Sequence, residues 1–285
     1  MSAILLEGKM IAENLKEVVK VEIAALKAKC KRTPKLVAFE IGENASSAVY
    51  MRAQKRLAET LGLEYELVRV PAKTSQKEAE ELIKKMNNDA LVAAIILQLP
   101  VPKDIDAKKL VNLISPAKDA EGMTSENLGH VLLGDYKIAP CTAMAVMELL
   151  LSTKVNLYGK EVVIVGHSEI VGKPLSLMLL NKFTTTTVCH IATGERGVLP
   201  EHVKKAEILI AAVGKPNIIK GDWIKDGAIV IDVGINRIGD KIFGDVEFET
   251  ALRRASYITP VPGGVGPLTT MMLMKNTVEL FKANI

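Results

Sequence analysis

A glycine-containing loop directly after an apolar strand is the clearest chemical feature of the sequence. Residues 162–165 are all Val or Ile, and they lead into Gly166, His167 and Ser168, with Gly172 following. Glycine lets a backbone approach a pyrophosphate, and the start of the next helix offers free N–H groups and the positive end of its dipole. The spacing is not GxGxxG, so the loop alone suits either a dinucleotide site or an ordinary strand-to-helix turn.

Two later turns favour the dinucleotide site. Residues 211–216 read AAVGKP and include Gly214, and residues 232–236 read DVGIN and include Ile235. Each turn follows an apolar strand. Ligands in open α/β sheets bind at the carboxyl ends of strands, where these turns fall. Three such turns in one part of the chain therefore predict a nucleotide-binding site.

The elements that must position these turns are apolar strands alternating with amphipathic helices. This alternation predicts an α/β protein with parallel sheets covered on both faces. In the first half we expect helices at 10–29, 44–61 and 76–86 and strands at 35–41, 64–70 and 92–97. In the second half we expect helices at 143–151, 172–180 and 268–282 and strands at 161–165, 187–189, 208–212 and 228–231.

Composition excludes several classes of function. Lys and Arg number 37 against 33 Asp and Glu, and this near balance predicts no nucleic-acid partner. The apolar run at 91–97 is far shorter than the ~18 residues that span a bilayer, so no membrane partner is expected. The start of the chain lacks a signal-peptide pattern, and the three cysteines show no CxxC spacing. We therefore expect a reduced, cytoplasmic protein without a metal site.

Motifs along the whole chain resemble the methylenetetrahydrofolate dehydrogenase/cyclohydrolase family. In the second half these are the run from 159 to 174, the two turns above, and residues 259–269, which read TPVPGGVGPLT. The first half agrees, with motifs in the same order. They are Ala45 and Ser46 before Tyr50, QLPVP at 98–102, Lys118 and Asp119 before Gly122, and Pro140, Cys141 and Thr142.

The resemblance implies two domains with a cleft between them. Residues 1–140 would form an α/β folate-binding catalytic domain, and the last helix, 268–285, would pack back onto it. Residues 141–267 would form a Rossmann-like NAD(P)-binding domain. The resemblance also implies a homodimer built through this second domain.

The family pattern assigns roles to residues of this chain. Tyr50 would flank the pterin and the one-carbon bridge, Gln98 would hydrogen-bond near the reacting centre, and Glu121 would hold the pterin ring. Pro262 and Gly263 would line the folate pocket. The positions that match the family's cofactor contacts are Gly166, His167, Ser168, Ile191, Gly214 and Ile235.

Three positions depart from the family pattern. Gln54 stands where bifunctional members have a lysine, one helical turn after Tyr50, while the neighbouring Lys55 points about 100° further round the helix. His167 and Ile191 replace an Arg and a Ser that hold the 2′-phosphate of NADP, which favours NAD over NADP. Glu121 stands where Asp is usual, which keeps the charge and changes the reach.

The predicted activity is oxidation of 5,10-methylenetetrahydrofolate to the methenyl form, with hydride transfer to NAD(P). This step needs alignment more than acid–base groups. Hydrolysis of the methenyl product needs a proton-transferring group, which glutamine cannot supply, so we expect weak or absent cyclohydrolase activity. Two alternatives stay open: a bifunctional enzyme that uses Lys55 or water in place of the lysine, and a non-catalytic folate- or nucleotide-binding protein.

Overall fold

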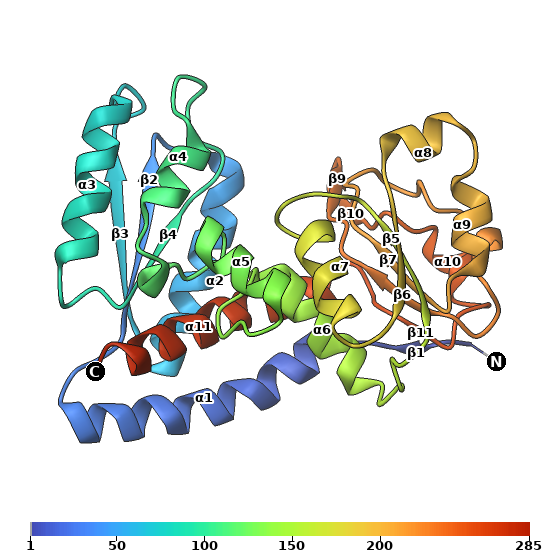
Figure 1. Cartoon of the computed structure of the whole chain (residues 1–285), viewed down its shortest axis with the longest axis horizontal. Coiled ribbons are helices and arrows are strands. Elements are labelled where there is room, and N and C mark those ends of the chain that lie inside the picture. Colours follow the sequence, from blue (N-terminus) through green and yellow to red (C-terminus); the bar gives the residue numbers. More distant parts are fainter. Residues whose placement is uncertain (1) are drawn as a thin grey trace. The chain divides into compact units, whose positions relative to one another are not determined.

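The computed structural model describes residues 2–285, except for the side chains of Ala45 and Ser46, so these two members of the family pattern lie outside the described side chains. The chain forms two compact units (Figure 1). The N-unit comprises Asn14–Cys141 and Thr270–Ile285, and the C-unit comprises Met1–Glu13 and Thr142–Thr269. Helices α1 (Gly8–Cys30) and α11 (Val265–Ala283) contribute residues to both units. The predicted α/β class is confirmed.

The N-unit is built on a three-stranded parallel sheet of order β3-β2-β4. Its strands are β2 (Lys35–Ile41), β3 (Glu64–Val70) and β4 (Ala94–Leu97). Every residue of β4 and all but the first of β2 are buried, as expected for the centre of a covered parallel sheet. In the same unit are α2 (Ala45–Leu61), α3 (Gln76–Asn88), α4 (Ala107–Leu113), the 3-10 helix η1 (Pro116–Lys118) and α5 (Ser125–Leu133).

Helices α3 and α4 supply one apolar layer of the N-unit. Ile83 of α3 and Leu110 of α4 pack in the same core cluster as Phe39 of β2 and Ile95 of β4. Helix α3 begins at a capping box, because the Ser75 hydroxyl accepts from the backbone N–H of Glu78 and the Glu78 carboxylate accepts from that of Ser75. The sheet therefore has a fixed covered face, and its carboxyl edge carries the loops that follow β2 and β4.

The C-unit is built on a six-stranded parallel sheet of order β1-β11-β8-β7-β5-β6. Its strands are β1 (Ile4–Leu5), β5 (Glu161–Val165), β6 (Thr185–Cys189), β7 (Ile208–Ala211), β8 (Ile229–Asp232) and β11 (Tyr257–Ile258). The chain also forms α6 (Cys141–Ser152), α7 (Gly172–Leu180), α8 (Ile191–Glu195), α9 (Leu199–Lys205), η2 (Gly221–Trp223), α10 (Phe248–Ala251) and the hairpin β9 (Asn236–Ile238) and β10 (Lys241–Phe243).

Helix α9 and the strands share the main core of the C-unit, in which Val163, Leu199, Val203, Leu209 and Val230 are all buried. β5 pairs with β6 on one side and β7 on the other, so the turns after these three strands meet at one edge of the sheet.

Residues 2–13 group with the C-unit, whereas the sequence-based assignment placed them with the first domain. Ile4 of β1 pairs with Tyr257 of β11, so the first residues extend the sheet of the C-unit. The two-residue strand is too short for a periodicity signal. Within the described residues, the structure contains no helix that is both long and apolar enough to span a bilayer.

Candidate functional site

The C-unit has a cavity of about 890 Å³ at the carboxyl ends of β5, β6 and β7. This volume is within the usual range for small-molecule and cofactor sites. Its lining includes residues of the glycine loop and of the loops after β6 and β7, namely Gly166, His167, Ser168, His190, Ile191 and Lys215. The position is the one at which ligands bind in open α/β sheets.

Two glycines, Gly166 in the cavity lining and Gly172 at the start of α7, allow the backbones beside this cavity to approach closely. Gly166 has φ +124°, and a Cβ at this position would overlap the carbonyl oxygen of Ala212. A Cβ on Gly172 would in turn overlap the carbonyl oxygen of Gly166. The backbone N–H of Gly166 also donates to Cys189 O at 2.8 Å. The close approach of these backbones leaves space only for glycine, which is the arrangement that a pyrophosphate cradle requires, so the residues present fit a dinucleotide.

Asp245, which lies outside every sequence motif, holds the loop after β7 in place. Its carboxylate is fully buried and accepts from the backbone N–H groups of Val213 at 2.6 Å, Gly214 at 2.9 Å and Lys215 at 2.9 Å. It also accepts from Asn236 Nδ2 at 2.9 Å. One side chain therefore binds both turns that the sequence pattern singled out.

Asp232, at the end of β8, is a second buried carboxylate next to Asp245. It accepts from the backbone N–H groups of Gly234, Asp245 and Val246 at 2.8–3.0 Å. Burial raises the pKa of Asp232 to about 6, although these hydrogen bonds act in the opposite direction. The pair is a structural support for the cofactor loops.

The predicted cofactor residues are distributed around this framework. Gly166, His167, Ser168 and Ile191 line the cavity itself. Gly214 lies in the loop bound by Asp245, and Ile235 lies in the turn after β8 with 47% of its surface exposed.

The N-unit brings Gln54 and Gln98 together. Gln54 is in α2, Gln98 follows β4, and both are buried. The Oε1 atom of Gln54 accepts from Gln98 Nε2 at 3.2 Å and from the Tyr65 hydroxyl at 3.1 Å. Burial and the nearby Glu40 carboxylate raise the pKa of Tyr65, so its phenol stays protonated as a donor. Both lone pairs of the Gln54 oxygen are thus occupied, and its amide can only donate further.

Tyr50 and Lys55 lie on the outer part of the same helix. Tyr50 is one turn before Gln54 and has 52% of its surface exposed, so its ring is accessible for stacking. Lys55 has a 60% exposed side chain, and its Nζ is 3.9 Å from the Glu59 carboxylate. The lysine next to Gln54 is therefore directed to solvent and paired, rather than placed beside Gln98.

Glu121 lies in the turn that follows the pairing of Asp119 with β4. Asp119 forms a parallel bridge with Ile95 of β4, the backbone N–H of Ala120 donates to Ile95 O at 3.1 Å, and Glu121 follows in the turn closed by Gly122 N and Asp119 O. Burial, with a contribution from the Asp119 charge, raises the pKa of Glu121 to about 8. Glu121 is therefore largely a neutral acid near pH 7, able to donate as well as accept a hydrogen bond.

Asn276, in α11, fixes the segment that carries Glu121. It is fully buried, and its Nδ2 donates to the carbonyl oxygens of Ala120 at 2.9 Å and Ala139 at 3.2 Å. Its Oδ1 is buried and has no hydrogen-bond partner among the described residues. Asn276 and Asp245 were missed from the sequence, because each supports its site from a distant part of the chain. Tyr65 was missed because it lies in β3, outside every motif.

Pro262 and Gly263 belong to the C-unit, unlike the other predicted folate contacts. The Val261–Pro262 and Leu99–Pro100 peptide bonds are cis, and Gly263 has φ +108° with its carbonyl accepting from Lys9 N at 3.3 Å. The folate pocket predicted between the units remains a prediction.

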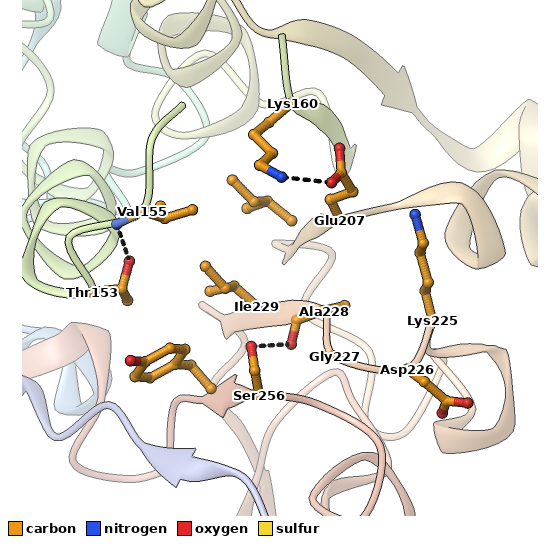
Figure 2. Close-up of a pocket in the computed structure, with 12 residues that line it drawn as sticks. Thr153, Val155, Lys160, Glu207, Lys225, Asp226, Gly227, Ala228, Ile229 and Ser256 are labelled. Atoms are coloured by element: carbon orange, nitrogen blue, oxygen red, sulfur yellow. Dashed lines mark hydrogen bonds and ion pairs between the residues drawn. The ribbon is translucent and has the colours of Figure 1, made fainter. Parts of the chain in front are cut away.

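A second cavity in the C-unit, of about 320 Å³, lies at the amino ends of the strands (Figure 2). Its charged groups are largely used within the fold: Lys160 Nζ pairs with Glu207 Oε1 at 2.7 Å, and the other carboxylate oxygen accepts from Glu161 N at 3.1 Å. Asp226 pairs with Arg254 at 3.0 Å. These pairs tie the starts of neighbouring strands together, at the edge opposite the one where ligands usually bind.

The fold and the glycine-lined cavity are those of an α/β enzyme with a dinucleotide-binding unit. Comparison with known proteins identifies the family to which the chain belongs. The catalytic-domain model of the tetrahydrofolate dehydrogenase/cyclohydrolase family matches residues 6–121, and its NAD(P)-binding-domain model matches residues 140–285. The chain belongs to this family. The predicted family and the enzyme class that it names are thereby confirmed.

Individual relatives agree over the full length. A bifunctional protein FolD of Moorella thermoacetica is 47% identical over 280 residues, covering 98% of this chain and 99% of that protein. The structure of the bifunctional FolD enzyme of Campylobacter jejuni superposes with a TM-score of 0.96 at 38% identity, covering 100% of both chains. The Trypanosoma brucei dehydrogenase-cyclohydrolase, solved with NADP and an inhibitor, gives 0.95 at 36% identity, covering 99% of this chain and 98% of that one.

Proposed function

We propose that this enzyme oxidises 5,10-methylenetetrahydrofolate to 5,10-methenyltetrahydrofolate with a nicotinamide dinucleotide as hydride acceptor. The observation that carries the proposal is the cavity lined by Gly166, His167 and Ser168, in a chain whose other unit presents Tyr50 and Gln98 in the family's order. The non-catalytic alternative has no specific observation in its favour, because the cradle and the polar cluster are both intact.

The residues of the chain would act mainly by alignment. The loop from Gly166 to Ser168 would hold the dinucleotide, which when bound supplies the hydride-accepting ring. Loss of hydride leaves a methenyl cation that the folate nitrogens stabilise, so no protein acid or base is required. Tyr50 would flank the one-carbon bridge and Gln98 would orient it, and alignment of this kind contributes several kcal/mol to catalysis.

Residue 54 determines how fast the enzyme hydrolyses 5,10-methenyltetrahydrofolate, the cyclohydrolase activity. The relatives described above are named as bifunctional, which favours the bifunctional alternative over a dehydrogenase without hydrolysis. Hydrolysis, however, requires a group that moves a proton as water attacks, commonly worth about 10²–10⁴-fold. Gln54 cannot do this, and Lys55 is paired with Glu59 at the surface. We therefore infer an enzyme that retains the bifunctional fold but hydrolyses the methenyl product slowly.

We infer a preference for NAD over NADP at neutral pH. Ile191 lines the cavity with 68% of its surface exposed, and it offers no hydrogen bond to a phosphate. His167 lines the same cavity and, when neutral, provides no charge to balance a dianion. The Trypanosoma brucei enzyme was solved with NADP, and this describes the cofactor of that enzyme only.

We also propose a homodimer through the C-unit, in a cytoplasmic setting. Tyr158 and Phe183 are each 72% exposed, and their ring centroids are 5.8 Å apart. Phe183 lies two residues before β6, which is an edge strand of the six-stranded sheet. An exposed aromatic pair beside an unpaired edge favours covering by a partner.

The oxidation is tested by supplying substrate deuterated at the methylene carbon together with NAD, and then analysing the nicotinamide by mass spectrometry. The proposal predicts deuterium on the reduced ring and release of the methenyl product. Binding of both ligands without deuterium transfer would support the non-catalytic alternative and overturn the proposal. Gln98→Ala, which should still bind NAD, serves as the matched variant with slowed transfer.

A further inference from the structure

Tyr65 of β3 is the hydroxyl donor of the cluster that contains Gln54 and Gln98. Phe39 of β2 packs in the core cluster with α3 and α4, so Leu36, three residues earlier, lies on the opposite face of the sheet. The register of β2 and β3 pairs Leu36 with Tyr65. The Tyr65 ring is therefore on this opposite face, from which its hydroxyl reaches Gln54 of α2.

The hydroxyl proton of Tyr65 sets the direction of the hydrogen bonds in the cluster. Among the described residues, the hydroxyl has one partner, Gln54 Oε1 at 3.1 Å. Turning the Gln54 amide round would leave this proton without an acceptor. Because Gln54 Oε1 faces Tyr65, its second hydrogen bond also needs a donor, and Gln98 supplies Nε2 at 3.2 Å. The Gln98 amide is thereby held with its Oε1 atom directed away from Gln54.

Glu40, a buried carboxylate at the same face of the sheet, supports Tyr65 as a donor. It is 3% exposed, and it accepts from Arg69 Nε at 2.6 Å and from the Ser47 hydroxyl at 3.1 Å. Burial raises the pKa of Tyr65, and the Glu40 charge raises it further. The phenol therefore keeps its proton near neutral pH, and the direction of its hydrogen bond does not change.

Two polar atoms of the cluster are left for a ligand, Gln98 Oε1 and Gln54 Nε2. No described residue forms a hydrogen bond to either atom. Neither is a buried unpaired atom, because Asn276 Oδ1 is the one such side-chain atom among the described residues. Both atoms therefore reach solvent, where one offers a carbonyl oxygen and the other offers N–H donors.

We propose that Tyr65 is a positioning residue for the oxidation, which fixes the Gln54 amide and thereby presents the carbonyl oxygen of Gln98, rather than its NH2 group, to the folate. The inference rests on the proposed function. In that reaction a C–H bond of the methylene carbon breaks, its electron pair and hydrogen pass to the oxidised nicotinamide, and positive charge is left on the folate. An oxygen directed at this developing charge stabilises the transition state, whereas N–H donors would oppose it.

The kinetic test uses Tyr65→Phe in the full-length protein, which keeps the ring and removes the hydroxyl. In single turnovers with saturating methylenetetrahydrofolate and NAD, we expect hydride transfer to slow about fivefold or more. The folate concentration that gives half the maximal rate should change less than about twofold, because the neutral substrate lacks the charge. In a Gln98→Ala background, Tyr65→Phe should have no further effect, because Tyr65 acts through Gln98.

Tyr136→Phe is the matched control. Tyr136 is half-buried in the same unit, and its hydroxyl makes no hydrogen bond among the described residues. Its removal should leave hydride transfer at the wild-type rate. Gln54→Met breaks the same chain of hydrogen bonds in α2, and it should slow hydride transfer about as much as Tyr65→Phe does.

A spectroscopic readout tests the positioning without turnover. The chain has three glutamines, Gln54, Gln76 and Gln98, so isotopic labelling of glutamine makes every such side-chain amide visible by NMR. In Tyr65→Phe the NH2 signals of Gln54 and Gln98 should shift and exchange faster with water. Gln76, whose amide donates to Glu80 within α3, should keep its signals.

The outcomes separate this inference from the proposed function. An unchanged rate in Tyr65→Phe, an equal loss in the wild-type and Gln98→Ala backgrounds, or unshifted Gln98 signals overturns the inference alone. A wild-type rate in Gln54→Met does the same, also where Tyr65→Phe does not fold. Absence of hydride transfer in the wild-type protein overturns the proposed function and the inference together.

Discussion

At the residue scale, Gln54 stands where bifunctional members of the family have a lysine. An amide at this position can orient neighbouring groups by hydrogen bonds but cannot transfer a proton. Gln54 has its oxygen occupied by Tyr65 and Gln98, which makes it a fixed part of a hydrogen-bonded cluster. Such a cluster holds Gln98 in one orientation and suits hydride transfer, in which alignment is decisive. The same cluster offers no base for the attack of water.

Glu121 gives a pH-dependent prediction at this scale. Its folded-state pKa of about 8 lies above the ordinary value of 4.5, so the folded protein binds more protons and loses stability as the pH rises between these values. Glu121→Gln removes this loss. The free energy of unfolding of the variant, relative to wild type, should increase on the order of 2–4 kcal/mol from pH 5 to pH 8 in urea titrations.

Glu126→Gln is the matched control for this measurement, because Glu126 is exposed on α5 in the same unit. Its unfolding curves should follow those of the wild type at both pH values. Parallel pH curves for wild type and Glu121→Gln would show that Glu121 is ionised in the folded protein and would contradict the assignment.

At the element scale, the cofactor site depends on backbones that approach closely. Gly166→Ala should raise the Kd for NAD by more than tenfold and lower stability by about 1–3 kcal/mol, because the added Cβ overlaps the Ala212 carbonyl. Gly227→Ala isolates the cost of a positive φ, since Gly227 has φ +79° and no atom within 4 Å of a built Cβ. An unchanged Kd for NAD in Gly166→Ala, measured by calorimetry, would contradict the cradle.

The loop after β7 gives a second prediction at the element scale. Asp245→Asn removes the charge and one acceptor from a side chain that binds three consecutive backbone N–H groups. We expect a loss of about 1–3 kcal/mol in stability and a weaker affinity for NAD, measured by thermal unfolding and titration. Asp240→Asn, at an exposed position paired with Arg237 at 3.8 Å, should change neither. Wild-type binding by Asp245→Asn would show that the loop does not need this carboxylate.

Most elements could be predicted from periodicity, and the exceptions have physical reasons. The strands at 35–41, 64–70 and 161–165 and the helix at 172–180 have the predicted bounds. Helices α8 and α10, with 5 and 4 residues, are too short to show a helical period, and β1 and β11 have 2 residues each. The motif residues of the cavity could be found because glycine turns have a local signature, whereas Asp245 and Asn276 act on segments distant in sequence.

At the scale of the whole molecule, the exposed aromatic pair Tyr158 and Phe183 predicts self-association. Phe183→Asp should convert a dimer into a monomer in sedimentation-velocity experiments, because a charge would have to be buried without a partner. Leu133→Asp is the matched control, since Leu133 is 74% exposed in the N-unit and should leave the dimer intact. A monomeric wild-type protein, or a dimer that tolerates Phe183→Asp, would contradict the proposed interface.

We propose that the chain oxidises the methylene substrate and that residue 54 limits hydrolysis of the methenyl product. The most direct measurement follows the loss of 5,10-methenyltetrahydrofolate without nicotinamide cofactor, using wild type, Gln54→Lys and Lys55→Gln, each first shown to oxidise the methylene substrate. We predict wild-type loss only slightly above the spontaneous rate, a gain on the order of 10²-fold in Gln54→Lys, and no change in Lys55→Gln. Rapid hydrolysis by wild type that Gln54→Lys does not increase would show that residue 54 does not limit this step.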